Sequence, residues 1–178
     1  MDSSLILRNI GRFLLVMLLQ ILVFNNLYLG GYINLFVYLV FLLMLPTTMG
    51  RIPMLLVAFG TGLCIDLFCN VMGLHASAAV VLVMCRILFG NKILTKGEQI
   101  EIDTPTIYTV SVSQYIWYLV LLTLIYSFVY FTLEIFSFSD FFKIMLLTLL
   151  STIGTSLVIL LYQLIFSDRD HSHGVKRN

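Results

Sequence analysis

Six apolar stretches, separated by short polar links, occupy most of the 178-residue chain. A helix needs about 20 apolar residues, within a range of about 17–25, to cross the hydrocarbon core of a bilayer. The first, fifth and sixth stretches meet this length, and the short middle ones are joined by links of a few residues, as in tight helical hairpins. The sequence therefore predicts an all-α polytopic membrane protein of six spans, forming one transmembrane domain over 1–166. The predicted spans are 10–28, 33–49, 52–69, 74–90, 113–135 and 141–166.

The composition argues against a soluble domain. Hydrophobic residues make up 60% of the chain and charged residues only 11%, whereas soluble domains carry about 25% charged residues. So few charged residues cannot cover a water-facing surface. We therefore expect lipid, and not water, to surround much of the protein. The first stretch is long and lacks an A-x-A-like cleavage site, so we expect it to remain as a span. No run of Lys or Arg indicates a nucleic-acid partner.

The basic residues predict an orientation. With six spans and a cytoplasmic N-terminus, nine of the ten Lys and Arg residues fall on the cytoplasmic side, which agrees with the positive-inside rule. Only Lys143 falls outside. The same topology places a cytoplasmic loop over 91–112 and a short cytoplasmic tail over 167–178. The nine residues are Arg8, Arg12, Arg51, Arg86, Lys92, Lys96, Arg169, Lys176 and Arg177.

An aspartate inside an apolar run is the main candidate site. Asp66 lies within "GTGLCIDLFCNVMGLHASAA" (residues 60–79), nine residues before His75. A carboxylate facing lipid is costly, so it should face protein or water. It could cap the neighbouring helix or pair with His75 and so fix the hairpin. It could also anchor a partner, or form a proton or ligand site. Gly62 lies one turn before Asp66, and Asn70 and Gly73 supply turn chemistry between the two helices.

The sequence shows no catalytic or metal-binding motif. It contains no G-x-S-x-G, no H-E-x-x-H and no glycine-rich phosphate loop. Cys64, Cys69 and Cys85 form no C-x-x-C pair, so neither a zinc site nor a redox pair is indicated. We therefore predict a protein that is not an enzyme and that needs no cofactor or metal.

Small residues on two spans are candidate helix-packing faces. Close approach of small residues and interhelical hydrogen bonds drive helix association in lipid, where each such bond contributes about 0.6–2 kcal/mol. These faces could meet a partner or pack within the chain, and the sequence does not separate the two. They comprise Ala76 and Ala79 on the fourth span, and Ser151, Gly154 and Thr155 on the sixth.

The polar hairpin resembles the signature of the rod shape-determining protein MreD family. Residues 62–76, "GLCIDLFCNVMGLHA", follow its pattern of a Gly, an apolar step, an Asp, two or three apolar residues, a short Gly-containing turn and then Leu-Gly-x-x-Ala-like residues. The turn "CNVMG" has one glycine where relatives often have more. The resemblance is residue-specific over about 51–86 and otherwise rests on length and membrane architecture.

The resemblance implies a non-enzymatic scaffold of the bacterial inner membrane. MreD-like proteins bind the membrane-anchored MreC, and with it couple the actin-like MreB filament to peptidoglycan synthases. Those synthases are a RodA-type glycosyltransferase and a penicillin-binding transpeptidase. The family resembles in fold the substrate-binding subunits of energy-coupling-factor vitamin transporters.

The alternative is a small-molecule-binding subunit of a membrane transporter. Such a subunit needs an outward-facing pocket lined by several polar groups. The residues that could contribute are Asp66, His75, Gln20, Asn25 and Asn26. A lipid-modifying enzyme is a third class of function. The sequence offers no base and nucleophile for it.

Overall fold

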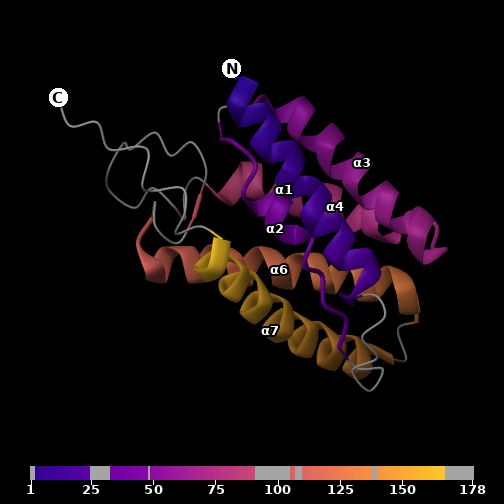
Figure 1. Ribbon diagram of the computed structural model, residues 1–178. Helices are drawn as coiled ribbons and strands as arrows, with labels where there is room; N and C mark the ends of the chain where they lie inside the picture. Colours follow the sequence, from indigo (N-terminus) through magenta and orange to yellow (C-terminus); the bar gives the residue numbers. More distant parts are fainter. Residues whose placement is uncertain are drawn as a thin grey trace.

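A computed structural model describes residues 3–24, 33–47, 49–90, 105–106, 110–137 and 140–166 of the chain (Figure 1). The described part is mostly helical. Most of the predicted loop over 91–112, the whole predicted tail over 167–178, and Asn25 and Asn26 lie outside it. The elements are α1 (Ser3–Leu22), α2 (Leu39–Leu43), α3 (Arg51–Cys69), α4 (Leu74–Cys85), the π-helical turn η2 (Arg86–Gly90), α6 (Val112–Ile135) and α7 (Phe141–Phe166).

Three of these helices are long and apolar enough to cross a membrane, namely α3, α6 and α7. Two shorter apolar helices cover Phe13–Leu22 and Leu74–Gly90. Large apolar side chains such as Leu56 on α3 and Ile153 on α7 point out of the bundle. The fold is therefore compatible with a membrane-embedded protein.

The bounds of four predicted spans coincide with helices to within one residue at each end. These are 52–69, 74–90, 113–135 and 141–166, which correspond to α3, α4 with η2, α6 and α7. The first helix begins at Ser3 instead of residue 10, and the predicted end at residue 28 lies outside the described residues.

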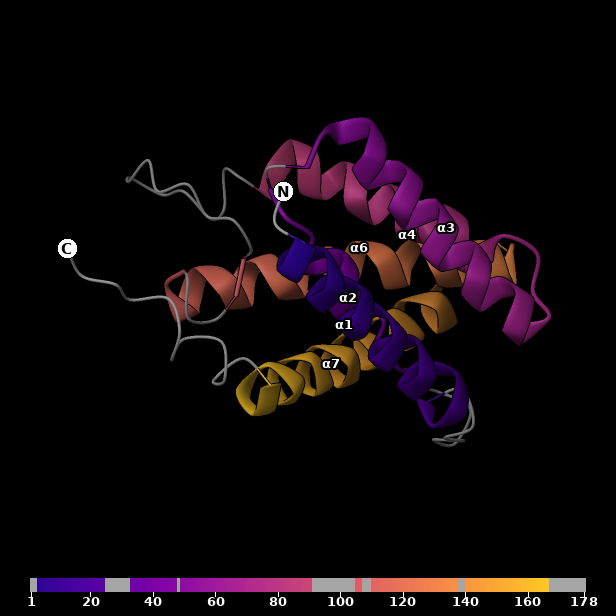
Figure 2. The ribbon, with the colours of Figure 1, turned by 45° about the horizontal axis from the view of Figure 1, so that its top comes forward.

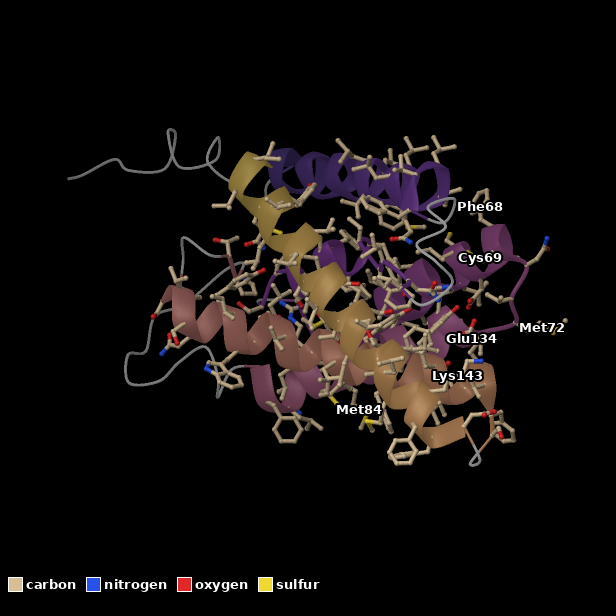
Figure 3. The ribbon with its side chains drawn as sticks, turned by 90° about the horizontal axis from the view of Figure 1, so that it is seen from below. Phe68, Cys69, Met72, Met84, Glu134 and Lys143 are labelled. Carbon is tan, nitrogen blue, oxygen red and sulfur yellow. The ribbon has the colours of Figure 1, made fainter. Side chains whose placement is uncertain are left out.

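The helices form two antiparallel hairpins, with α4 packed against α6 (Figures 1 and 2). The α3–α4 turn and the α6–α7 link lie at the same end of the molecule. Figure 3 shows this from below, with Cys69 and Met72 near Glu134 and Lys143. We call this the Asp66 end. The opposite end, where α3 and α6 begin and η2 lies, is the Arg86 end.

The predicted helix over 33–49 is wrong. Only Leu39–Leu43 is helical, and the described backbone on either side is irregular or turned. This central segment, residues 33–47, lies under α1 and next to α4 in Figure 1. Nearly all side chains from Phe36 to Leu45 are buried. Irregular backbone is tolerated at membrane depth only when protein surrounds it and satisfies its polar groups. Side chains on α1, η2, α6 and α7 do so here.

Candidate functional site

Asp66 caps the first turn of the neighbouring helix. Its two carboxylate oxygens accept hydrogen bonds from the backbone N–H groups of His75 (2.9 Å) and Ala76 (3.0 Å) at the start of α4. The first N–H groups of a helix have no intrahelical partner, and the helix dipole favours a negative charge there. Asp66 itself is only 4% exposed. The carboxylate thus joins the end of α3 to the beginning of α4.

Gly62 allows α3 and α4 to approach this closely. A Cβ at this position would lie 2.4 Å from Ala76 Cα and 2.6 Å from Ala76 N. These are backbone atoms of α4, which cannot move aside as a flexible side chain can. The close contact brings the Asp66 carboxylate within hydrogen-bonding distance of the α4 N–H groups.

The turn between the two helices uses two left-handed residues. Asn70 ends α3 with φ 55° and ψ 35°, and Gly73 precedes α4 with φ 73°. The N–H groups of Asn70 and Val71 both bond to the Asp66 carbonyl. Glycine adopts this backbone conformation without steric cost, and asparagine tolerates it better than most residues. The predicted set Gly62, Asp66, Asn70, Gly73 and His75 is therefore gathered in one hairpin.

The His75 side chain faces two tyrosines. Its Nδ1 lies 2.8 Å from the Tyr126 hydroxyl and 3.4 Å from the Tyr38 hydroxyl, and the two hydroxyls also hydrogen-bond to each other. The imidazole packs at 4.7 Å between ring centroids against Tyr130. Phe36 stands edge-on to the same cluster. This network ties α4, α6 and the central segment together.

A second buried centre lies at the Arg86 end. Arg86 is 5% exposed, and its guanidinium donates to the backbone carbonyls of Leu42 (3.1 Å) and Leu45. Its Nε donates to the Tyr118 hydroxyl (2.8 Å), and that hydroxyl donates in turn to the Leu43 carbonyl (3.1 Å). The last carbonyls of a helix carry partial negative charge, which favours a cation. Arg86 and Tyr118 therefore close the C-terminal end of α2.

Gln20 on α1 holds the other end of α2. Its Oε1 accepts hydrogen bonds from the N–H groups of Val37 (2.7 Å) and Tyr38 (3.3 Å). Its Nε2 donates to the Leu35 carbonyl (2.9 Å). One amide side chain thus supplies both an acceptor and a donor to backbone that lacks helical partners.

Two hydroxyl groups of α7 accept hydrogen bonds from further backbone N–H groups of the central segment. Ser151 accepts from the Asn34 N–H (3.0 Å) and Thr155 from the Phe36 N–H (3.1 Å). Two residues of extended chain span about 6.6 Å and four residues of helix about 6.0 Å, so the spacings match. Gly154 leaves room between them, because a Cβ there would meet Leu35 Cδ2 at 2.8 Å.

The candidate packing faces are thus used inside the chain. Ser151, Gly154 and Thr155 contact the central segment. Ala76 lies against Gly62, and Ala79 is fully buried. Of the two alternatives, packing within the chain and contact with a partner, these contacts show packing within the chain.

Asp66, His75 and Arg86 are all engaged in hydrogen bonds within the chain. Within the described ranges, no group of three or more His, Cys, Asp or Glu residues could hold a metal ion. A cavity of about 150 Å³ lies elsewhere, at the Asp66 end of the α6–α7 hairpin. It is lined by Phe128, Thr132, Phe136, Ser137, Phe141 and Ile144.

The second centre is not predicted from the sequence. The sequence predicts no bonding partner for Arg86 and no role for Tyr118, nor for Tyr38 and Tyr126 beside His75. The available signal was the presence of polar side chains such as Gln20 and Arg86 within apolar stretches. Such side chains face the bundle interior and often bond to backbone carbonyls.

The chain matched no protein-family model, no curated protein and no solved structure. The resemblance of residues 62–76 to the MreD signature therefore stays a prediction.

Proposed function

We propose that this chain is a non-enzymatic scaffold subunit of a bacterial cell-elongation complex, of the MreD type. In this proposal it binds an MreC-like partner and helps to couple MreB filaments to peptidoglycan synthases. It lies in the inner membrane with six crossings and both termini in the cytoplasm. One of the six crossings is the partly helical central segment.

The observation that carries the proposal is the role of the signature residues in the hairpin. Gly62 permits helix contact, Asp66 caps α4, and Gly73 makes the turn. A sequence pattern whose polar members hold helices together suits a protein that presents a fixed surface to partners. It gives no reason to expect a reaction, since the Asp66 oxygens are engaged by backbone N–H groups.

The transporter alternative finds less support. Ligand pockets usually measure about 300–1,000 Å³ and carry several convergent polar groups. The α6–α7 cavity of about 150 Å³, which is lined by described residues, has mainly apolar side chains in its lining and does not include Gln20, Asp66 or His75. Those three residues are bonded within the fold.

Affinity purification from native membranes tests the partner. We expect the tagged chain to recover a single-span protein with a periplasmic coiled coil, as MreC has. A matched purification of the Gly62→Ala variant should recover less of it at equal abundance of the bait. Recovery of an ATPase module without such a partner would contradict the scaffold proposal and favour the transporter.

Reporter fusions test the topology separately. Fusions after Gly50, Lys96 and Asn178 should report a cytoplasmic location, and fusions near Gly31, Met72 and Ser139 an exported one. A cytoplasmic reporter at Met72 would place the Asp66 end on the wrong side and would exclude the six-crossing arrangement.

A further inference from the structure

Five buried hydroxyl groups of the α6–α7 hairpin have no hydrogen-bond partner among the described residues. Their side chains are between 0% and 5% exposed. They are Thr123 and Ser127 on α6, and Thr148, Thr152 and Ser156 on α7. We call them the hydroxyl rows.

The spacing of the hydroxyl rows is regular. Within each helix they recur every four residues, so each row follows one face. The two helices are antiparallel and pack together. Ser127 and Thr148 lie at nearly equal sequence distances from the link between the helices, and so do Thr123 and Thr152. The rows therefore run side by side through the same depth of the bundle.

Other hydroxyls of this protein behave differently. Thr61 donates to the Val57 carbonyl (2.7 Å), Thr132 to the Phe128 carbonyl (2.7 Å) and Ser77 to the Gly73 carbonyl (2.8 Å). This bond to the preceding turn is the usual way for Ser or Thr to satisfy its donor within a helix. The hydroxyl rows do not make this bond, so their five hydroxyl groups have no partner among the described residues.

The geometry of the rows suits one small ligand. Hydroxyls four residues apart on a helix lie about 6 Å apart along the axis. A water molecule makes its O–H···O bonds of about 2.7–2.8 Å at a roughly tetrahedral angle, so one molecule joins oxygens about 4.5 Å apart and two in series join oxygens about 6 Å apart. A short chain of water molecules can therefore bridge successive hydroxyls, and a buried water makes about three hydrogen bonds at polar sites.

An open volume lies at one end of the rows. The cavity of about 150 Å³ is lined by Ile144, one turn before Thr148 on the same face, and by Phe128, which follows Ser127 in sequence. Thr132 and Ser137 add two hydroxyls to its lining. This cavity therefore adjoins the end of the hydroxyl rows that lies toward the Asp66 end of the hairpin.

We propose that the α6–α7 hairpin binds a file of water molecules along the hydroxyl rows. The file supplies hydrogen-bond partners to Thr123, Ser127, Thr148, Thr152 and Ser156. It makes the interface between α6 and α7 a hydrated one.

Solid-state NMR on the full chain in lipid bilayers tests the proposal. With ¹³C-labelled threonine, magnetisation that starts on water should reach Thr123, Thr148 and Thr152 early. Thr61 is the internal control, because it is equally buried and bonded to its own helix, so its signal should rise several-fold more slowly. The Thr152→Val variant assigns the Thr152 signal. Equal, slow rise at Thr152 and Thr61 would overturn the proposal.

The melting temperature of the same protein gives an independent readout. Removing a hydroxyl that holds water leaves that water short of a partner, so Thr152→Val and Ser156→Ala should each lower the melting temperature by a few degrees. Removing an unsatisfied hydroxyl from a dry interface should raise it. An increase in both variants would therefore also overturn the proposal.

Discussion

The two ends of the α4–η2 helix are both held by a buried ionic side chain, but over very different distances in sequence. At the Asp66 end, the carboxylate binds N–H groups only 9 and 10 residues away. At the Arg86 end, the guanidinium binds carbonyls 44 and 41 residues away, in the central segment. The first centre closes a local hairpin, and the second fixes a segment that has little regular structure of its own.

This difference predicts that the Asp66 end stabilises the α3–α4 hairpin, whereas the Arg86 end stabilises the whole bundle. The Asp66 cap satisfies groups that helix α4 leaves unpaired at its start. Arg86, with Gln20, Ser151 and Thr155, satisfies backbone that would otherwise be unpaired deep in the bundle. Loss of an Arg86 contact should therefore affect several elements together, whereas loss of the Asp66 cap should affect mainly the hairpin.

The largest effect is expected for Arg86→Leu. It leaves the buried carbonyls of Leu42 and Leu45 without donors, and each unpaired buried group costs about 1–3 kcal/mol. Unfolding by SDS titration, followed by circular dichroism, should show a loss of about 2–6 kcal/mol. Arg51→Leu is the matched control, because Arg51 is exposed at the start of α3. Equal stability of the two variants would mean that Arg86 does not hold the central segment.

A smaller loss is expected for Gly62→Ala. The added methyl group would meet the α4 backbone at 2.4 Å, and overpacking of this kind costs about 1–3 kcal/mol. Gly60→Ala is the control, since a Cβ there meets nothing within 4 Å. The same titration should leave Gly60→Ala unchanged or slightly more stable. If both variants behave alike, the close α3–α4 contact is not required.

The effect of replacing Asp66 should depend on whether the new side chain keeps the shape and an acceptor oxygen, and not on whether it keeps the charge. Asparagine keeps one carbonyl acceptor, so Asp66→Asn should retain part of the cap, while Asp66→Leu should lose about 0.5–2 kcal/mol, as typical for an N-cap. A blot would measure the abundance of each variant in the membrane, and growth complementation would measure its function. Equal loss of function for both variants at normal abundance would instead indicate that the charge moves protons or binds a ligand.

The smallest effect is expected at the contact of α7 with the central segment. Thr155→Val removes the acceptor for one N–H group, that of Phe36, and should cost about 1 kcal/mol. Thr155→Ser keeps the hydroxyl and should restore most of the stability in the same titration. Failure of serine to restore it would point to methyl packing and not to the hydrogen bond.

The sequence predicted the helices better than the centre of the bundle. The bounds of α3, α4 with η2, α6 and α7 followed from apolar length and flanking polar residues, because both are local signals. The hairpin residues around Asp66 were also recognisable, since their partners lie within ten residues.

The central segment could not be predicted in this way. Hydropathy records that residues 33–49 avoid water, and it does not distinguish a lipid-facing helix from irregular chain enclosed by protein. The groups that satisfy this backbone lie on α1, η2, α6 and α7, up to 119 residues away. A single sequence gives no direct signal for such distant contacts.

The long reach of these hydrogen bonds has a consequence for biosynthesis. The N–H groups of Asn34 and Phe36 receive their acceptors from residues that are 117 and 119 positions later in the chain. At translation rates of about 5–20 residues per second, that delay is on the order of ten seconds. During this interval the nascent segment has to stay near water, the translocon or an insertase before it can settle at membrane depth. Completion of the fold therefore awaits the emergence of α7 from the ribosome.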